Sequence, residues 1–282
     1  MRELTDAYVL SNGVRIPCVG FGTWQTPDGD TAVMAVKEAI KAGYRHIDCA
    51  ACYGNEGSVG KAIKESDVSR GELFITSKLW NAERGYDKTM AAFEKTCIDL
   101  GVEYLDLYLI HWPANKKQFA NWEELNLETW RAMTDLYKAG KIKAIGVSNF
   151  MPHHLKALME TEVKPMLNQI EYHPGLMWKD TVEYCNENGM LIEAWSPLGT
   201  GRMLTNETLK QIADKYNKSV AQLCIRWVLQ HGILPLPKSI TPSRIKENAL
   251  VFDFEISNED MKIIDSLDNF GGSGLHPDEF NF

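Results

Sequence analysis

The sequence has no long apolar run. A helix that crosses a bilayer needs roughly 20 consecutive apolar residues, and no segment of this chain provides them. The opening segment, MRELTDAYVL, is mixed and polar, which does not fit a secretion signal. We therefore expect a protein with no membrane partner and a cytoplasmic location.

Cysteine is scarce, with six among the 282 residues. Scattered in this way they do not form a disulfide framework, which again favours a reducing compartment. Cys49 and Cys52 make a lone CxxC pair, but no second pair or neighbouring histidine completes a zinc site. The pair is either a redox motif or, as we favour, two small residues that act as spacers.

The chain also lacks an excess of positive charge. Its formal net charge is −8, so nucleic acid is a poor general partner. Hydrophobic residues make up 44% and charged residues 24%, as in ordinary globular proteins. A local basic site for a small phosphate is compatible with this composition.

Two further absences concern the fold. No linker rich in Ser, Gly or Pro divides the chain, so we expect one domain over residues 1–282. No G-x-G-x-x-G fingerprint follows an early strand, which argues against a doubly wound dinucleotide-binding sheet. Short β-rich runs alternate instead with amphipathic segments. Eight such runs occupy residues 19–23, 46–50, 73–79, 105–112, 144–149, 167–172, 191–195 and 233–237.

Most of these runs are continuously apolar, as in strands that are buried on both faces of a parallel sheet. The segments between them read as helices that stop at glycine, for example at Gly43, Gly101 and Gly232. Eight strands that each precede a helix predict an α/β fold, the closed (β/α)8 or TIM barrel. Ahead of them, YVLSNGVRIP predicts a β-hairpin around Asn12 and Gly13, which could plug the bottom of the barrel.

Four ionisable residues fall where barrel enzymes carry their chemistry, at the carboxyl ends of the strands. Asp48 lies near the end of the second predicted strand and Tyr53 begins the loop beyond it. Lys78 ends the third strand and His111 the fourth. Because charged residues are seldom buried without partners, four such residues on one rim predict a functional site.

These four residues suit carbonyl reduction. Lys78 is expected to lower the pKa of the Tyr53 phenol, and Asp48 to pair with Lys78 and keep it charged. Tyr53 could then give a proton to a carbonyl oxygen, while His111 donates a second hydrogen bond that fixes the direction of the carbonyl. No metal is required, but the hydride has to come from a cofactor because no side chain supplies one.

Aromatic and amide side chains share the same rim. Tryptophans follow the first, third and fourth strands and would line an apolar pocket for a small carbonyl compound. Amides and hydroxyls on the fifth and sixth strands could hold a nicotinamide carboxamide, and a tryptophan on the seventh could stack on its ring. The residues concerned are Trp24, Trp80 and Trp112, and then Ser148, Asn149, Gln169 and Trp195.

After the eighth strand the chain reads LPKSITPSRIKENAL. Thr241 is a favourable N-cap and Pro242 a favourable first residue for a helix. Lys238, Ser239 and Arg244 surround this helix start with donors, as the monophosphate on a nucleotide ribose needs. The sequence therefore favours NADPH over NADH as the cofactor.

Taken together, these motifs resemble one family over essentially the whole chain. GFGTW, GYRHIDCAACYGNE, TSKLW, DLYLIHWP, IGVSNF, NQIEYHP, AWSPLG and PKSITPSRIKEN all match the aldo-keto reductases, in order. The resemblance implies a barrel that binds NADPH in extended form without a Rossmann fold. It implies an enzyme that reduces aldehydes and ketones to alcohols, and a monomer.

The resemblance also assigns roles to residues. Tyr53 becomes the proton donor, Asp48 and Lys78 tune it, His111 orients the carbonyl, and the three tryptophans fall at substrate positions. Nicotinamide and pyrophosphate contacts are implied for Gly22, Thr23, Asp48, Ser148, Asn149, Gln169, Trp195, Ser196 and Leu198. Contacts to the 2'-phosphate and adenine are implied for Lys238, Ser239, Arg244, Glu247 and Asn248.

The segment after SLDNF is short and ends in GGSGLHPDEFNF. It resembles the branch with a short C-terminal loop, which includes diketogluconate, glyoxal and methylglyoxal reductases and protozoan prostaglandin F synthases. That branch predicts an open pocket and broad substrate acceptance. The sequence is also compatible with two other functions. One is a nucleotide-binding regulatory subunit of a potassium channel, which the complete set of four residues argues against. The other is an isomerase or lyase that uses Asp48 and Lys78 without a cofactor.

Overall fold

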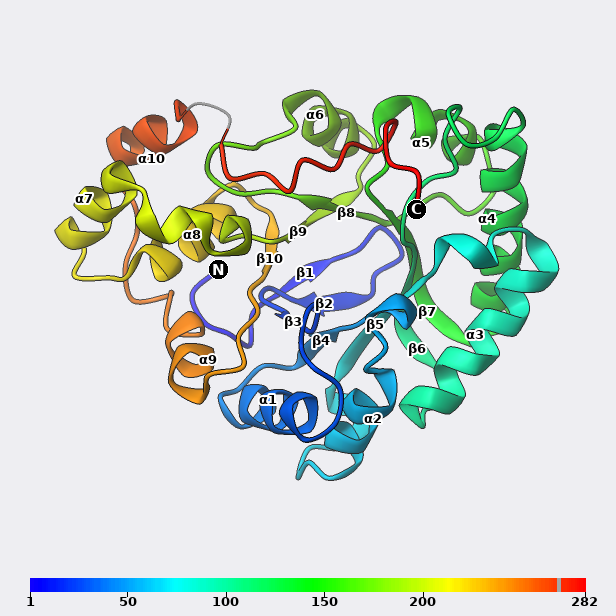
Figure 1. Cartoon of the computed structure of the whole chain (residues 1–282), viewed down its shortest axis with the longest axis horizontal. Helices are drawn as coiled ribbons and strands as arrows, with labels where there is room; N and C mark the ends of the chain where they lie inside the picture. The colour runs from blue at the N-terminus through cyan, green and yellow to red at the C-terminus, as the bar shows by residue number, and fades with distance from the viewer. Residues whose placement is uncertain (268–269) are drawn as a thin grey trace.

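The computed structural model describes residues 1–267 and 270–282 of the chain (Figure 1). Eight parallel strands form one sheet in which each strand pairs with its neighbours in the sequence. Each of them overlaps one of the eight predicted runs. They are β3 (Phe21–Gly22), β4 (His46–Asp48), β5 (Phe74–Leu79), β6 (Leu105–Ile110), β7 (Ile142–Ser148), β8 (Leu167–Glu171), β9 (Leu191–Trp195) and β10 (Leu234–Leu236).

The sheet closes on itself at a seam between β3 and β10. The amide of Gly20 donates to the carbonyl oxygen of Pro235 at 3.0 Å, and that of Gly22 to Pro237 at 3.1 Å. The close approach of the strands leaves no room for a side chain at Gly20, because a Cβ there would lie 2.4 Å from Cδ2 of Leu236. The predicted (β/α)8 barrel is therefore confirmed, and the doubly wound sheet is not formed.

Helices surround the barrel and bury one apolar stripe each against it (Figure 1). Helices end at the predicted glycines. Gly101 is the C-cap of α3 with a φ of 64°, and Gly43 and Gly232 follow α1 and α8 with φ values of 103° and 73°. No helix in the described ranges is long and apolar enough to cross a membrane. The bounds are α1 (Asp30–Lys41), α2 (Glu56–Lys64), α3 (Tyr86–Leu100), α4 (Trp122–Lys138), α5 (Pro152–Met159), α6 (Lys179–Glu187), α7 (Glu207–Lys215), α8 (Val220–Gln230), α9 (Pro242–Asn248) and α10 (Asn258–Asp265).

The predicted hairpin forms from β1 (Ala7–Val9) and β2 (Arg15–Pro17), which pair antiparallel. Asn12, in its turn, donates from Nδ2 to the carbonyl oxygen of Lys143 at 2.9 Å, at the start of β7. The Tyr8 hydroxyl donates to Ile233 just ahead of β10, at 3.4 Å. Both contacts lie at the amino ends of barrel strands, so the hairpin covers the bottom of the barrel and leaves the carboxyl ends open.

The contact between α2 and α3 gives a test of the packing. A Cβ on Gly60 would come within 2.3 Å of the backbone oxygen of Leu100, which has little room to move. We expect Gly60→Ala to destabilise the fold by about 2 kcal/mol, as overpacking does, when measured by urea unfolding. Gly57→Ala in the same helix is the matched control, since its Cβ would lie 3.9 Å from the nearest neighbouring atom, the backbone oxygen of Asp99. Equal stability of the two variants would contradict this packing.

Candidate active site

The four ionisable side chains predicted from strand ends meet at the carboxyl end of the barrel. Asp48 ends β4, Lys78 is the penultimate residue of β5, and His111 directly follows β6. Tyr53 ends a single turn of 3-10 helix, Ala51–Tyr53, in the loop after β4. Since β4, β5 and β6 are adjacent in the sheet, their ends bring the four residues together.

Lys78 is at the centre of this group. Its Nζ donates to Oδ1 of Asp48 at 2.6 Å, to the carbonyl oxygen of Cys49 at 2.9 Å and to the Tyr53 hydroxyl at 3.3 Å. The three protons of the ammonium therefore have three acceptors. The side chain is fully buried, which a lysine tolerates because its charge is paired and its donors are satisfied.

The structure corrects the expected pKa of Tyr53. Burial lowers the pKa of Lys78, but the charge and hydrogen bond of Asp48, together with the neighbouring Tyr53 and Cys49, outweigh burial, so its pKa is raised overall and the ammonium persists. Burial raises the pKa of Tyr53 by more than Lys78 lowers it. Lys78 thus lowers the pKa of Tyr53 as predicted, but the net shift is upward, and the sequence does not show how fully the phenol is enclosed. Tyr53 keeps its proton at neutral pH, as a donor must, and Lys78 favours the phenolate left behind.

His111 is a neutral ring beside the phenol. Burial, followed by the charge of Lys78, lowers its pKa well below the ordinary value. Its ring meets that of Tyr53 edge to face at 5.7 Å. Its Nδ1 lies 3.5 Å from the thiol of Cys52, whose pKa burial raises to about 11, so the thiol keeps its proton. A thiol donating to Nδ1 leaves the single N–H of the imidazole on Nε2.

A cavity of about 1070 Å³ opens above these groups. Every predicted site residue lines it except Thr23 and Lys78. Lys78 lies beneath the cavity, where it contacts two of the lining residues, Asp48 and Tyr53. Thr23 is fully buried and donates from Oγ1 to the carbonyl oxygen of Asp48 at 2.9 Å. The Thr23 hydroxyl therefore supports the strand of Asp48, and the expected cofactor contact of Thr23 stays a prediction.

The amide wall of the cavity is held by hydrogen bonds between strands. The indole N–H of Trp195 donates to Oδ1 of Asn149 at 2.8 Å, and Nδ2 of Asn149 donates to the carbonyl oxygen of His111 at 3.0 Å. Asn149 and Ser196 have φ values of 63° and 51°, a left-handed conformation that non-glycine residues adopt mainly at constrained sites. The wall is therefore preorganised.

The basic end of the cavity lies at α9. This helix begins after Thr241 as predicted, but the Thr241 side chain makes no capping hydrogen bond. Lys238 and Arg244 both line the cavity here. Nζ of Lys238 donates to the carbonyl oxygen of Gln25 at 3.0 Å. One cavity thus joins a rim of titratable groups to a pair of cations.

Several lining residues were not predicted. Cys52 of the CxxC pair lines the cavity, whereas Cys49 is buried, and both are free thiols, so the interpretation of the pair as spacers stays a prediction. Phe282 stacks on Trp80 with ring centroids 5.9 Å apart and meets Trp112 edge on at 5.5 Å. It belongs to the tail segment, residues 270–282, whose sequence carries no pattern that connects it with the strand ends.

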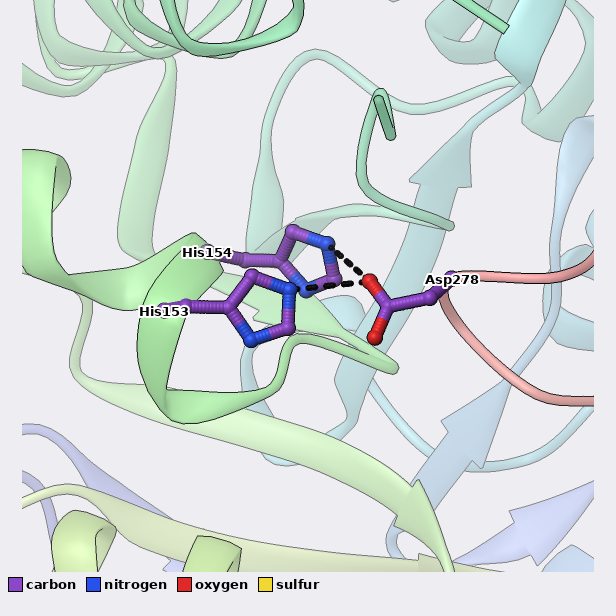
Figure 2. Close-up of side chains that lie close together, drawn as sticks. All are labelled: His153, His154 and Asp278. Carbon is purple, nitrogen blue, oxygen red and sulfur yellow. Dashed lines mark hydrogen bonds and ion pairs between the residues drawn. The ribbon is translucent and has the colours of Figure 1, made fainter. Parts of the chain in front are cut away.

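The tail segment is attached to α5 by a cluster with the composition of a metal site. Figure 2 shows His153 and His154 directed at one oxygen of Asp278, with their Nε2 atoms 2.8 Å and 3.1 Å from Oδ1. Nδ1 of His154, however, accepts the amide hydrogen of Met151 at 3.1 Å. The proton of this ring is therefore on Nε2, where it faces Asp278 and leaves no lone pair for a metal. The cluster fastens the tail segment to α5.

Comparison with known proteins identifies the class. Residues 18–269 match the sequence profile of the Aldo/keto reductase family. The chain belongs to this family, so the resemblance seen in its motifs, and with it the assignment as an oxidoreductase, is confirmed.

Individual relatives fit the predicted short-loop branch. The chain is 54% identical over 281 residues to a glyoxal reductase of Bacillus subtilis (strain 168), which covers 99% of each chain. It is 48% identical over 279 residues to a 9,11-endoperoxide prostaglandin H2 reductase of Trypanosoma cruzi (strain CL Brener), covering 98% of this chain and 96% of the relative. A crystal structure of a Gox0644 variant in complex with NADPH has a TM-score of 0.92 and 40% identity, over 99% of this chain and 100% of that one.

The buried ion pair predicts a pattern of stability changes. Lys78→Met leaves the Asp48 carboxylate with Gln169 as its side-chain donor. We expect a loss of about 3–5 kcal/mol in the free energy of unfolding, because an unpaired buried charge remains. The double variant Asp48→Asn with Lys78→Met removes both charges and should recover much of that loss. A double variant as unstable as Lys78→Met in chemical denaturation would rule out the ion pair as the cause.

Proposed function

We propose that the protein reduces aldehydes and ketones to alcohols with NADPH, and that Tyr53 is the proton donor. The observation that carries this proposal is the contact of the Tyr53 hydroxyl with a fully buried Lys78–Asp48 pair, on the wall of a cavity that continues to Lys238 and Arg244. A protonated phenol next to a buried cation suits a step in which a carbonyl oxygen gains negative charge.

The lining of the cavity fits an extended dinucleotide. One end carries amides and an indole held in place by hydrogen bonds, and the other carries two cations that suit a phosphate. The family relationship and the NADPH complex of a similar protein support the same cofactor. When bound, NADPH supplies the hydride that reduces the carbonyl carbon. Gly22, Gln169, Ser196 and Leu198 would hold its nicotinamide and pyrophosphate half, and Ser239, Glu247 and Asn248 its adenosine half.

The residues of this chain then act in defined ways. His111, through its Nε2–H, donates to the carbonyl oxygen and fixes its direction. Tyr53 donates its proton to the same oxygen, and Lys78 stabilises the phenolate as it forms. Asp48 holds Lys78 in place. Trp24, Trp80 and Trp112 surround the carbonyl with apolar surface and exclude water.

Small carbonyl compounds are the substrate class that we propose. Similarity to a glyoxal reductase supports short dicarbonyls as the first candidates. Phe282 and Leu275 of the tail segment narrow the mouth next to the tryptophans. That the protein accepts carbonyl compounds of very different size is still a prediction. We also propose that it acts as a monomer in the cytoplasm.

Tyr53→Phe tests the role of the phenol. We expect the rate of NADPH oxidation with glyoxal or benzaldehyde to fall by at least about 100-fold, as loss of a general acid does. The affinity for NADPH, followed by quenching of tryptophan fluorescence, should change little because the hydroxyl is not needed to hold the nucleotide. Substantial turnover by the variant would exclude Tyr53 as the donor. Nucleotide binding without turnover in the unchanged protein would favour a regulatory subunit.

Arg244→Met tests the basic end of the cavity. Loss of a forked contact to the 2'-phosphate should weaken the binding of NADPH by about tenfold, or about 1.4 kcal/mol, and leave the affinity for NADH almost unchanged. Arg131→Met on α4 is the control, because Arg131 packs over Tyr86 and does not line the cavity. An equal effect on both nucleotides would show that Arg244 does not contact the 2'-phosphate.

A further inference from the structure

A second carboxyl group is buried behind the catalytic group. Glu193 lies on β9 and is completely buried. Nε2 of Gln169 donates to Oδ2 of Asp48 at 2.9 Å and to Oε2 of Glu193 at 2.6 Å. A single amide nitrogen thus bridges two carboxyl groups. The reduction described above assigns no role to Glu193.

The other oxygen of Glu193 faces a histidine nitrogen that, among the described residues, also lacks a hydrogen-bond partner. Oε1 of Glu193 and Nδ1 of His46 are 3.7 Å apart, and within the described residues neither has a hydrogen bond. His46 is fully buried, and its Nε2 lies 2.9 Å from Oγ1 of Thr76. Two buried polar atoms without partners are costly. One proton between Oε1 and Nδ1, with a closer approach of about 1 Å, would satisfy both.

The balance of charge points to the same proton. The titratable groups around Glu193 are His46 and Asp48 on β4 and Lys78 on β5. Gln169 on β8 is uncharged, and β3 and β10 carry no titratable side chain. Lys78 is bonded directly to Asp48, so an ionised Glu193 would be a second negative charge without a cation of its own. Two carboxyl groups that share one buried site hold a proton between them.

We propose that Glu193 is a positioning residue in its protonated form: its Oε1–H is directed at Nδ1 of His46, and its Oε2 holds the amide of Gln169. Burial, and then the charge of Asp48, raises the pKa of Glu193 to about 8. Burial lowers the pKa of His46 to about 3, so the ring accepts rather than carries the proton. Asp48 is then the single negative charge beneath Tyr53.

The consequence for the reaction rests on the proposed function. Both hydrogens of the Gln169 amide are taken by carboxyl groups, so its Oε1 is left as an acceptor for a nicotinamide carboxamide. When Glu193 loses its proton, a second negative charge enters next to Asp48. This charge makes Tyr53 a weaker acid and slows reduction.

The proton itself can be tested without cofactor or substrate. A carboxyl group whose pKa is higher in the folded than in the unfolded protein makes folding less favourable as the pH rises between the two pKa values, here from about pH 4.5 to about pH 8. Glu193→Gln cannot lose a proton, yet its amide can accept from Gln169 and donate to His46. The Tm of Glu193→Gln minus that of the unchanged protein should therefore rise by about 5 °C or more from pH 5 to pH 9. A difference that does not depend on pH would overturn the proposal.

Two further variants keep this test decisive. Glu193→Met also removes the titration but makes no hydrogen bond, so its Tm difference should rise with pH in the same way even where Glu193→Gln folds poorly. Glu171→Gln on β8 is the matched control, because this buried carboxylate receives hydrogen bonds on both oxygens from Ser273, at 2.8 Å and 2.7 Å. The same pH trend in Glu171→Gln would show that the titration does not belong to Glu193.

Activity then separates positioning from a purely structural role. At pH 6 to 7, Glu193→Gln should have the kcat/KM of the unchanged protein. Glu193→Met should have a raised KM for NADPH, because Asp48 alone then holds the amide of Gln169. By pH 9 the kcat/KM of Glu193→Gln, divided by that of the unchanged protein, should rise by about tenfold, which is the effect of one pKa unit. A constant ratio alongside the expected Tm trend would overturn the positioning role. If neither the variants nor the unchanged protein reduce a carbonyl at any pH, the proposed function fails. The Tm measurements still show whether Glu193 is protonated in the folded protein.

Discussion

The ammonium of Lys78, buried with three acceptors around it, is the interaction on which the site depends. It binds the end of β4 through Asp48 and Cys49, and it reaches the cavity through the Tyr53 hydroxyl. A buried charge tolerates little movement, because each lost contact leaves it without compensation. The Lys78–Asp48 pair therefore fixes the position of Tyr53, and its ammonium also stabilises the phenolate that remains after Tyr53 gives up its proton.

The barrel makes this pair possible. Adjacent parallel strands bring their carboxyl ends to one rim, and the seam between β3 and β10 closes the wall behind the charges. Closure excludes water, which strengthens the attraction between Lys78 and Asp48 and also makes a second free carboxylate unfavourable. The protonation that we assign to Glu193 is thus a consequence of the enclosure that supports the catalytic group.

The sequence predicted what depends on order along the chain. Continuous apolar runs gave the eight strands, and the polar residues at their ends gave Asp48, Lys78 and His111. It did not predict what depends on closure: Thr23 turned out to face the strand of Asp48, and burial raised the pKa of Tyr53 although Lys78 lies beside it. Glu193 gave no signal, since a glutamate inside a strand looks the same whether it faces solvent or the barrel interior. Phe282 was missed because its contact with Trp80 joins distant parts of the chain.

A crystal structure of the protein with the oxidised nucleotide and a carbonyl inhibitor tests the central claim most directly. The account predicts the nicotinamide ring against Trp195, with the carbonyl oxygen within hydrogen-bonding distance of both the Tyr53 hydroxyl and Nε2 of His111. A nicotinamide bound elsewhere, or a carbonyl oxygen in contact with neither of these groups, would contradict it.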